Sequence, residues 1–218
     1  MIIQNPTTDP LSDVLALTGF RAACSVRLQA GGDWALRFNP IELKFNVVRR
    51  GDCWLRVGQL PPWHLRPGDC FVVSRTPFIL ASDPALEAID ASAVFAPSGM
   101  SATLGIGDEV ELLGGSVSLT SPSASELLAI LPPVIVIRAQ SPDASSFAWL
   151  LDELDKEWQS AQPGAYALCN DLLRVIFVHA LRHHIAHAEV TDLAWLGGLP
   201  PSTAVGCGCP AWITSMRG

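Results

Sequence analysis

The most constraining feature of the sequence is a series of short β-type segments before residue 122. They are rich in β-branched and aromatic residues, and Gly, Pro and Asp separate them. No helical crossover of ten or more residues lies between them, so parallel β-α-β units are not expected. The pattern predicts an antiparallel jelly roll or a similar small barrel, with strands at Ala23–Leu28, Trp34–Phe38, Leu43–Arg49, Cys53–Val57, Trp63–Leu65, Cys70–Val73 and Glu109–Leu119.

Helical patterns dominate the chain behind residue 122. Capping signals predict a short helix at Ser123–Ile130, and a strand follows at Val134–Ile137. Two longer helices are expected, one from Ser141 and one from Pro163 to about Ala188. A further short helix, Asp9–Thr18, is predicted before the barrel. The helix from Ser141 carries an apolar stripe on one face, made of Phe147, Leu150, Leu151, Leu154 and Trp158.

The last predicted helix is apolar around almost its whole circumference. Such a helix has to be covered on two sides. The barrel or the neighbouring helix can cover one side, and a second copy of the chain is the simplest cover for the other. We therefore expect a homodimer held mainly by this helix, whose apolar residues include Leu172, Leu173, Val175, Ile176, Phe177, Val178, Ala180 and Leu181.

Composition excludes several classes of protein. Of the 218 residues 49% are hydrophobic and only 16% are charged, which favours an oligomer. The net charge of −7 is the wrong sign for a body that binds nucleic acid. No stretch is long and apolar enough to span a membrane, and no secretory leader is recognisable, so a cytoplasmic protein is expected. Six cysteines without a repeating spacing argue against a disulfide framework, and four of them, Cys24, Cys53, Cys70 and Cys169, are expected to be buried.

Several motifs, taken in their order, resemble the amino-terminal cupin domain of AraC-type transcription regulators. The motifs are ELKFNVVRRGDCWLRVG, HLRPGDCFVVSRTPFILASDP, LGGSVSL, LLAILPPVIVIRA and LLRVIFVHALRHHI. The resemblance covers most of residues 9–187. It implies a cupin barrel that binds a small effector and dimerises through the helices behind it.

The resemblance also suggests how the chain is divided. We expect a cupin-like effector domain at residues 1–138, a helical dimerisation segment at 139–190 and an irregular tail at 191–218. Complete members of the family carry a helix-turn-helix domain that binds DNA, and no such pattern follows residue 187. The chain is therefore expected to sense an effector and dimerise without binding DNA itself.

Many cupins are metalloenzymes, and the resemblance locates the positions where metal ligands would stand. The glutamate expected seven residues before Gly51 is Lys44, and the histidine expected after Pro77 is Phe78. The two earlier histidine positions fall near Phe38 and Pro40. Lys, Phe and Pro offer no lone pair to a divalent cation at neutral pH. We therefore predict a barrel without metal or other cofactor.

The same positions suggest an organic ligand. Side-chain alternation places Lys44, Asn46 and Val48 on the inner side of their strand if the cupin register holds. A lysine and an amide facing Phe78 suit an effector that carries an acid or a carbonyl group. The predicted ligand-binding residues are Lys44, Asn46, Phe78, Trp34, Phe38 and His64. In the alternative, Lys44 extends to solvent, and Trp34, Trp54 and Trp63 merely fill the barrel.

The remaining polar motifs give little support for an enzyme. His179, His183 and His187 recur at a helical spacing that can hold a metal ion, but no Glu or Cys completes a ligand set, and solvated or interface histidines are the better explanation. No nucleophile elbow or phosphate loop is present, and GIGDEV at 105–110 is typical of a turn. We expect a non-enzymatic module with no catalytic residue. The alternatives are a small cupin isomerase or dioxygenase, or a remnant without ligand.

Overall fold

The strand-rich half of the chain forms two β-sheets in the computed structural model, which describes residues 20–95, 101–119, 131–141, 144–160 and 162–187. Sheet A contains, in spatial order, β11 (Val134–Ile137), β6 (Cys70–Ser74), β3 (Leu43–Arg50), β10 (Val110–Leu119), β1 (Phe20–Ala30) and β9 (Ser101–Leu104). Sheet B contains β5 (Trp63–Leu65), β4 (Cys53–Val57), β7 (Phe78–Ala81), β2 (Ala35–Phe38) and β8 (Ile89–Asp90), and a 3-10 turn, η1 (Ala91–Ala93), follows.

This arrangement confirms the predicted cupin-type fold. Each strand predicted from the sequence is present, with its ends shifted by three residues at most. Three strands, β7, β8 and β9, were not predicted. The strands are also not antiparallel throughout, because β9 pairs with β1, and β8 with β2, in parallel. Both parallel pairs involve the outermost strand of a sheet, where the chain crosses over the end of the barrel.

Sheet A is buried on both of its faces, which explains its unbroken apolar segments. Along β3, Leu43, Phe45 and Val47 belong to a core on the outer face of the sheet, whereas Val48 belongs to the barrel interior. The strands β6, β10 and β11 alternate in the same way. A strand with two buried faces has no need of polar residues at every second position. The run VIVI of β11 follows from this placement.

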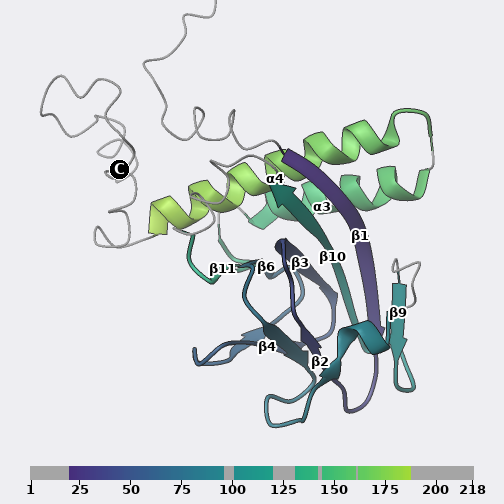
Figure 1. The fold of residues 1–218 in the computed structure, drawn as a ribbon, viewed down its shortest axis with the longest axis vertical. Helices are drawn as coiled ribbons and strands as arrows, with labels where there is room; N and C mark the ends of the chain where they lie inside the picture. Colours follow the sequence, from purple (N-terminus) through teal and green to yellow (C-terminus); the bar gives the residue numbers. More distant parts are fainter. Residues whose placement is uncertain (1–19, 96–100, 120–130, 142–143, 161, 188–218) are drawn as a thin grey trace, which may run out of the picture.

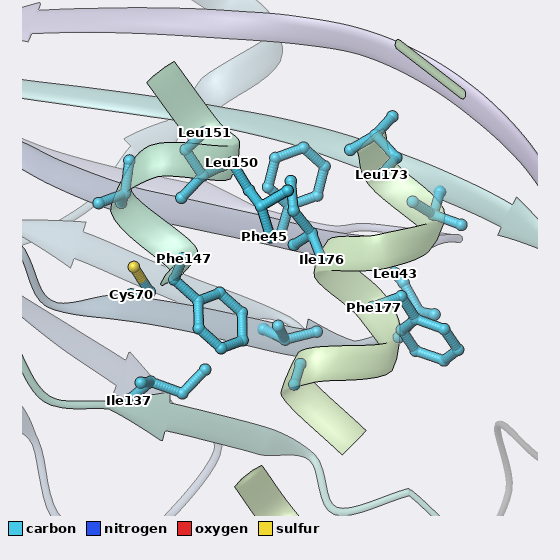
Figure 2. Packing of buried hydrophobic residues seen from close by; sticks show 14 of the residues in the cluster. Leu43, Phe45, Cys70, Ile137, Phe147, Leu150, Leu151, Leu173, Ile176 and Phe177 are labelled. Carbon is cyan, nitrogen blue, oxygen red and sulfur yellow. The ribbon is translucent and has the colours of Figure 1, made fainter. Parts of the chain in front are cut away.

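Two helices, α3 (Ala144–Ser160) and α4 (Ala165–His187), cover the outer face of sheet A (Figure 1). Figure 2 shows Phe147 of α3 and Ile176 and Phe177 of α4 above Leu43 and Phe45 of the sheet. The predicted stripe of α3 is confirmed for its buried members, Phe147, Leu150, Leu151 and Leu154. The helices therefore share one hydrophobic core with the barrel.

The sequence predicts that α4 is covered on two sides, and the single chain supplies the cover on one side only. One face of α4 is buried against sheet A and α3, including Cys169, Leu173, Ile176, Phe177, Ala180 and Leu181. Tyr166, Leu168 and Val175 are exposed on the other side. The apolar character of α4 is therefore satisfied on one face only in the single chain.

Polar contacts fasten the helical layer to the barrel. Asp69, which is buried in the turn before β6, accepts hydrogen bonds from the backbone N–H of Ala139 (2.8 Å) and from Arg138 Nη1 (2.9 Å). Arg138 Nη1 also donates to the carbonyl oxygen of His64 at 2.7 Å. The segment between β11 and α3 is thus held both by β5 and by the turn between β5 and β6. Arg27 of β1 pairs with Asp155 of α3 at 2.8 Å on the same side of the sheet.

Gly51 lies in the turn between β3 and β4 and occupies a conformation that few other residues can adopt. Its φ is +68°, and a Cβ atom there would lie 2.2 Å from the backbone oxygen of Glu109. Only glycine fits without moving this turn.

Some sequence predictions lie outside the described residues. They are the helices at Asp9–Thr18 and Ser123–Ile130 and the tail with Cys207 and Cys209. Among the residues that are described, no helix has the length and apolarity needed to cross a membrane.

Candidate functional site

A cavity of about 520 Å³ opens between the two sheets of the barrel. Its walls come from β1, β3 and β10 of sheet A, from β2, β7 and the end of β8 of sheet B, and from η1. Most of its surface is apolar, as expected for a small-molecule site. The lining residues are Val26, Leu28, Arg37, Phe38, Asn39, Pro40, Lys44, Asn46, Phe78, Leu80, Asp90, Ala91, Ser92, Phe95, Leu112, Gly114 and Gly115.

Four of the predicted ligand-binding residues line this cavity together. Lys44 and Asn46 belong to β3, Phe38 ends β2 and Phe78 begins β7. Val48 also lies on the inner side of β3, so the register expected from the resemblance is the one observed. Pro40 lines the same cavity. The residues that the resemblance puts at or near cupin metal-ligand positions, namely Lys44, Phe78, Phe38 and Pro40, thus line one cavity.

The wall on the side of sheet B is aromatic. The rings of Phe38 and Phe78 are stacked, with centroids 4.8 Å apart and planes 9° apart. Phe95 packs obliquely on Phe38 at 6.2 Å, and Phe71 meets the edge of Phe78 at 6.0 Å. Stacked and edge-on rings hold one another in place, so the aromatic wall is preformed.

The opposite wall contains a buried hydrogen-bond donor without a partner. Asn46 Nδ2 is buried and makes no hydrogen bond in the structure. The Asn46 side chain lies against Gly114 of β10, where a Cβ atom would come within 2.1 Å of Asn46 Oδ1. Gly114 is thus required for the position that Asn46 adopts. A buried amide group without a partner is costly, and a ligand acceptor in the cavity would remove that cost.

The mouth of the cavity carries polar groups that are already paired. Asp90 Oδ1 accepts hydrogen bonds from the backbone N–H of Ser92 (2.8 Å) and from its hydroxyl (2.6 Å), and Asn39 Nδ2 donates to Oδ2 at 3.2 Å. These bonds, together with the charge of Arg37, hold the pKa of the Asp90 carboxyl below its ordinary value. Asp90 therefore remains charged at neutral pH and links the start of η1 to Asn39, the residue after β2.

The structure places two predicted residues away from this cavity. Trp34 directly precedes β2 and faces the barrel interior like Phe38, but it lies at the other end of the strand and lines a separate cleft. His64 stands on the outer face of sheet B, where its ring stacks on Trp54 at 4.7 Å and Nε2 lies 3.5 Å from Asp52 Oδ2. Neither residue belongs with Lys44 and Asn46.

Other lining residues were not predicted as part of a site. Gly114 and Gly115 stand in the quoted segment LGGSVSL, and two successive glycines inside a strand signal a close approach of another group. Asp90 and Ser92 carry a local capping pattern that could have located the turn at η1. Phe95 has no distinguishing signal in the sequence.

The helix histidines do not form a metal centre in the described part of the chain. The rings of His183 and His187 lie 4.2 Å apart, and His187 Nδ1 donates to the carbonyl oxygen of His183 at 2.8 Å. His179 instead packs on the edge of Phe147. No three His, Cys, Asp or Glu side chains among the described residues are placed to hold a metal ion together.

The predicted burial of the cysteines is confirmed for Cys53, Cys70 and Cys169. Burial, aided by nearby carboxylates, raises the pKa of the Cys53 and Cys70 thiols to about 12. They are therefore protonated at neutral pH and are poor nucleophiles. The side chain of Cys24 lies outside the described part of the structure.

Comparison with known proteins identifies the class to which this fold and cavity belong. The cupin family model matches residues 9–186, so the chain belongs to the cupin family. It is 38% identical over 207 residues to a protein of Streptomyces lividans named as an AraC-like transcription regulator, covering 91% of this chain and 68% of that protein. A protein of the same name from Streptomyces antibioticus is 40% identical over 196 residues, with 88% and 64% covered. The chain thus spans about two thirds of the length of these relatives.

Solved structures match the chain at low similarity only. ToxT of Vibrio cholerae, in a form with bound unsaturated fatty acid, is 10% identical with a TM-score of 0.40, covering 91% of this chain and 68% of ToxT. The AraC-like transcriptional activator CuxR is 13% identical with a TM-score of 0.34, covering 72% and 56%.

Proposed function

We propose that this chain is the effector-sensing part of an AraC-like transcription regulator and that it binds a small organic anion in the cavity between its sheets. The observation that carries the proposal is the joint placement of Lys44 and the unpartnered Asn46 amide in an otherwise apolar cavity with an aromatic wall. An acid of this kind would place its carboxylate at β3 and its apolar body against Phe38 and Phe78.

The charges of the lining agree with an anionic guest. The cavity is lined by two basic residues, Arg37 and Lys44, and by one acidic residue, Asp90, so the formal charge of the lining is +1. Arg37 and Asp90 stand together at the mouth, where each offsets the other. Lys44 belongs to the other wall, beside the amide donor of Asn46. A carboxylate accepts hydrogen bonds from both kinds of group.

A thermal-shift screen with Lys44→Met tests this proposal. A ligand that binds only the folded state raises its melting temperature by mass action. We expect carboxylates and phenolates to raise the melting temperature of the wild type and to lose most of that effect with Lys44→Met, which keeps the length and the apolar stem. Lys156→Met, at an exposed lysine of α3 paired with Glu153, should respond like the wild type.

Two results would contradict the proposal. In one, acids stabilise the wild type and Lys44→Met equally. In the other, only neutral or cationic compounds shift the melting temperature.

The enzyme alternative finds less support in the cavity. The side chains of Lys44, Phe78, Phe38 and Pro40 stand where a metal-dependent cupin would need ligands. The buried thiols of Cys53 and Cys70 lie in the two cores and do not line the cavity. These residue types favour the binding of a ligand over the catalysis of a reaction. A regulator of this class would act in the cytoplasm.

A second part of the proposal concerns self-association through the outer surface of the helices. Trp149 of α3 is 60% exposed and Val175 of α4 is 42% exposed. Both line a groove of about 360 Å³ between the helices, together with Ser145, Ser146, Leu150 and His179. Exposed apolar side chains of this size commonly mark an interface. A second copy of the chain would cover the face of α4 that the barrel leaves open.

The chain is also proposed not to bind DNA by itself. Its net charge of −7 opposes contact with phosphates. In a gel-shift assay at physiological salt, the purified chain should therefore bind no DNA sequence in preference to competitor DNA.

A further inference from the structure

A second cleft lies at the open edge of the barrel, and the function proposed above does not use it. This edge cleft has a volume of about 200 Å³ and shares no lining residue with the ligand cavity. It is lined by Asp33, Trp34, Ala35, Leu86, Glu87, Ile89, Leu104 and Gly105.

The edge cleft is bordered by the outermost described strands of both sheets. Ile89 belongs to β8, the outermost strand of sheet B, and Leu104 ends β9, the outermost strand of sheet A. In Figure 1, β9 stands beside β1, at the end of β1 that points away from α3 and α4. Strand edges carry backbone groups that can pair with another extended chain.

The floor of the cleft contains a polar group that lacks a partner. Trp34 is 5% exposed, and its indole Nε1 is buried without a hydrogen bond. The backbone of Trp34 is satisfied by Ser82, which exchanges hydrogen bonds of 3.0 Å and 2.9 Å with it. A backbone carbonyl oxygen of a docked segment could accept from this indole N–H, whereas an arginine or lysine side chain could not.

The rim of the cleft is acidic and apolar. Asp33 and Glu87 are exposed, and the lining contains no basic residue. Ile89 is exposed within the cleft, and Ile106, directly after Gly105, is 97% exposed. An apolar surface flanked by two carboxylates suits a long side chain with an apolar stem and a cationic end.

From these features we infer that the edge cleft docks an extended, basic segment of a partner protein. An arginine or lysine side chain would lie over Trp34 with its charge between Asp33 and Glu87, and the segment's backbone would run along the sheet edge. The volume supports a side chain of a polypeptide over a free small molecule, because small-molecule pockets commonly measure about 300–1,000 Å³. A cation over an indole ring gains further attraction.

A random heptapeptide library, selected on the full chain, tests the inference. We expect the selected peptides to carry arginine or lysine flanked by apolar residues. The double variant Asp33→Asn/Glu87→Gln should weaken their binding about fivefold, as two exposed charge pairs would contribute. The matched control, Asp171→Asn/Glu42→Gln, also removes two carboxylates but touches no residue of the cleft, and it should bind like the wild type.

A second measurement follows Trp34 itself. The indole N–H signal of Trp34 in a ¹H–¹⁵N spectrum, assigned with Trp34→Phe, should shift on addition of a selected peptide. The inference is overturned if no peptide is enriched over the bare support, if enriched peptides lack basic residues, or if the double variant binds them as the wild type does. It is also overturned if free arginine amide binds as tightly as the peptides, since the cleft would then be a small-molecule site.

Discussion

At the scale of single residues, the ligand cavity depends on the pair Asn46 and Gly114. The two residues are register partners on β3 and β10, and the Asn46 side chain occupies the space where any other residue at 114 would place a Cβ atom. Gly114→Ala should therefore destabilise the protein by about 1–3 kcal/mol, the usual cost of overpacking. Denaturant unfolding measures this change.

A double-mutant cycle separates this contact from a general effect on the strand. In the background of Asn46→Ala, the same Gly114→Ala change should cost clearly less, because the clashing amide is gone. Equal costs in the two backgrounds would mean that the close approach of the Phe45 backbone oxygen, 3.0 Å from the added Cβ, governs the effect instead.

The sequence alone could identify part of this cavity because strand alternation decides which face a side chain occupies. Lys44 and Asn46 could be placed in this way once the resemblance set the register, whereas Phe78 was placed by the resemblance alone because β7 was not predicted. Alternation does not decide how far along the barrel a residue lies. Trp34 is on the inner side with Phe38 but four residues away, a distance of roughly 13 Å along a strand, so it meets a different cleft. His64 pairs with Trp54 on the outer face, a register that only the folded hairpin sets.

At the scale of elements, strands with a clear pattern of β-branched and aromatic residues could be predicted from the sequence. Strands that form only by pairing with a strand far away in the sequence could not. The strands β4, β5 and β11 match their predicted bounds. The two-residue strand β8 and the four-residue strand β9 form only because they add in parallel to β2 and β1. The apolar circumference of α4 predicted burial correctly on one face, but the pattern alone could not tell the barrel from a partner.

The placement of Ile176 on α4 gives a prediction for this element. Ile176 is buried with Leu43, Phe45 and Phe177 between the helix and sheet A. Ile176→Asp should therefore cost on the order of 4 kcal/mol, because it places an unpaired carboxylate in the core, and thermal unfolding should show partial or complete loss of structure. Val175→Asp, one residue earlier on the exposed side of the helix, should keep the folded circular dichroism spectrum of the wild type. A folded and stable Ile176→Asp protein would contradict this packing.

Asp69 gives a second prediction at this scale, because it joins the barrel to the segment that leads into α3. It is 2% exposed and accepts hydrogen bonds from Arg66 N, Ala139 N and Arg138 Nη1. Asp69→Asn replaces one acceptor oxygen by a donor and should cost about 1–3 kcal/mol in denaturant unfolding. Asp108→Asn, which removes an exposed ion pair with Arg50, is the matched control and should have little effect. Equal effects of the two changes would mean that Asp69 acts only as a surface charge.

At the scale of the whole molecule, sheet A connects the ligand cavity with the helical layer. Lys44 and Asn46 line the cavity, whereas Leu43, Phe45 and Val47, which alternate with them on β3, pack under α3 and α4. A ligand and a partner copy would therefore meet opposite faces of the same strand. In the proposed sensor, only the thickness of sheet A would therefore separate the effector from the helices that form the dimer surface.

The proposed dimer leads to the last prediction. It is tested best by a substitution at an exposed residue, because such a residue does not contribute to the core of the single chain. Val175 is exposed and lines the groove beside Trp149, so a charge there disturbs an interface without entering the core. Light scattering at tens of micromolar should give twice the chain mass of 23.3 kDa for the wild type and a mass near one chain for Val175→Asp, with the same circular dichroism for both. Leu60→Asp places the same charge on an equally exposed apolar residue in the turn between β4 and β5, away from the groove, and it should remain dimeric. A monomeric wild type, or a Val175→Asp protein that dimerises as well as the wild type, would show that the groove between α3 and α4 is not where two copies meet.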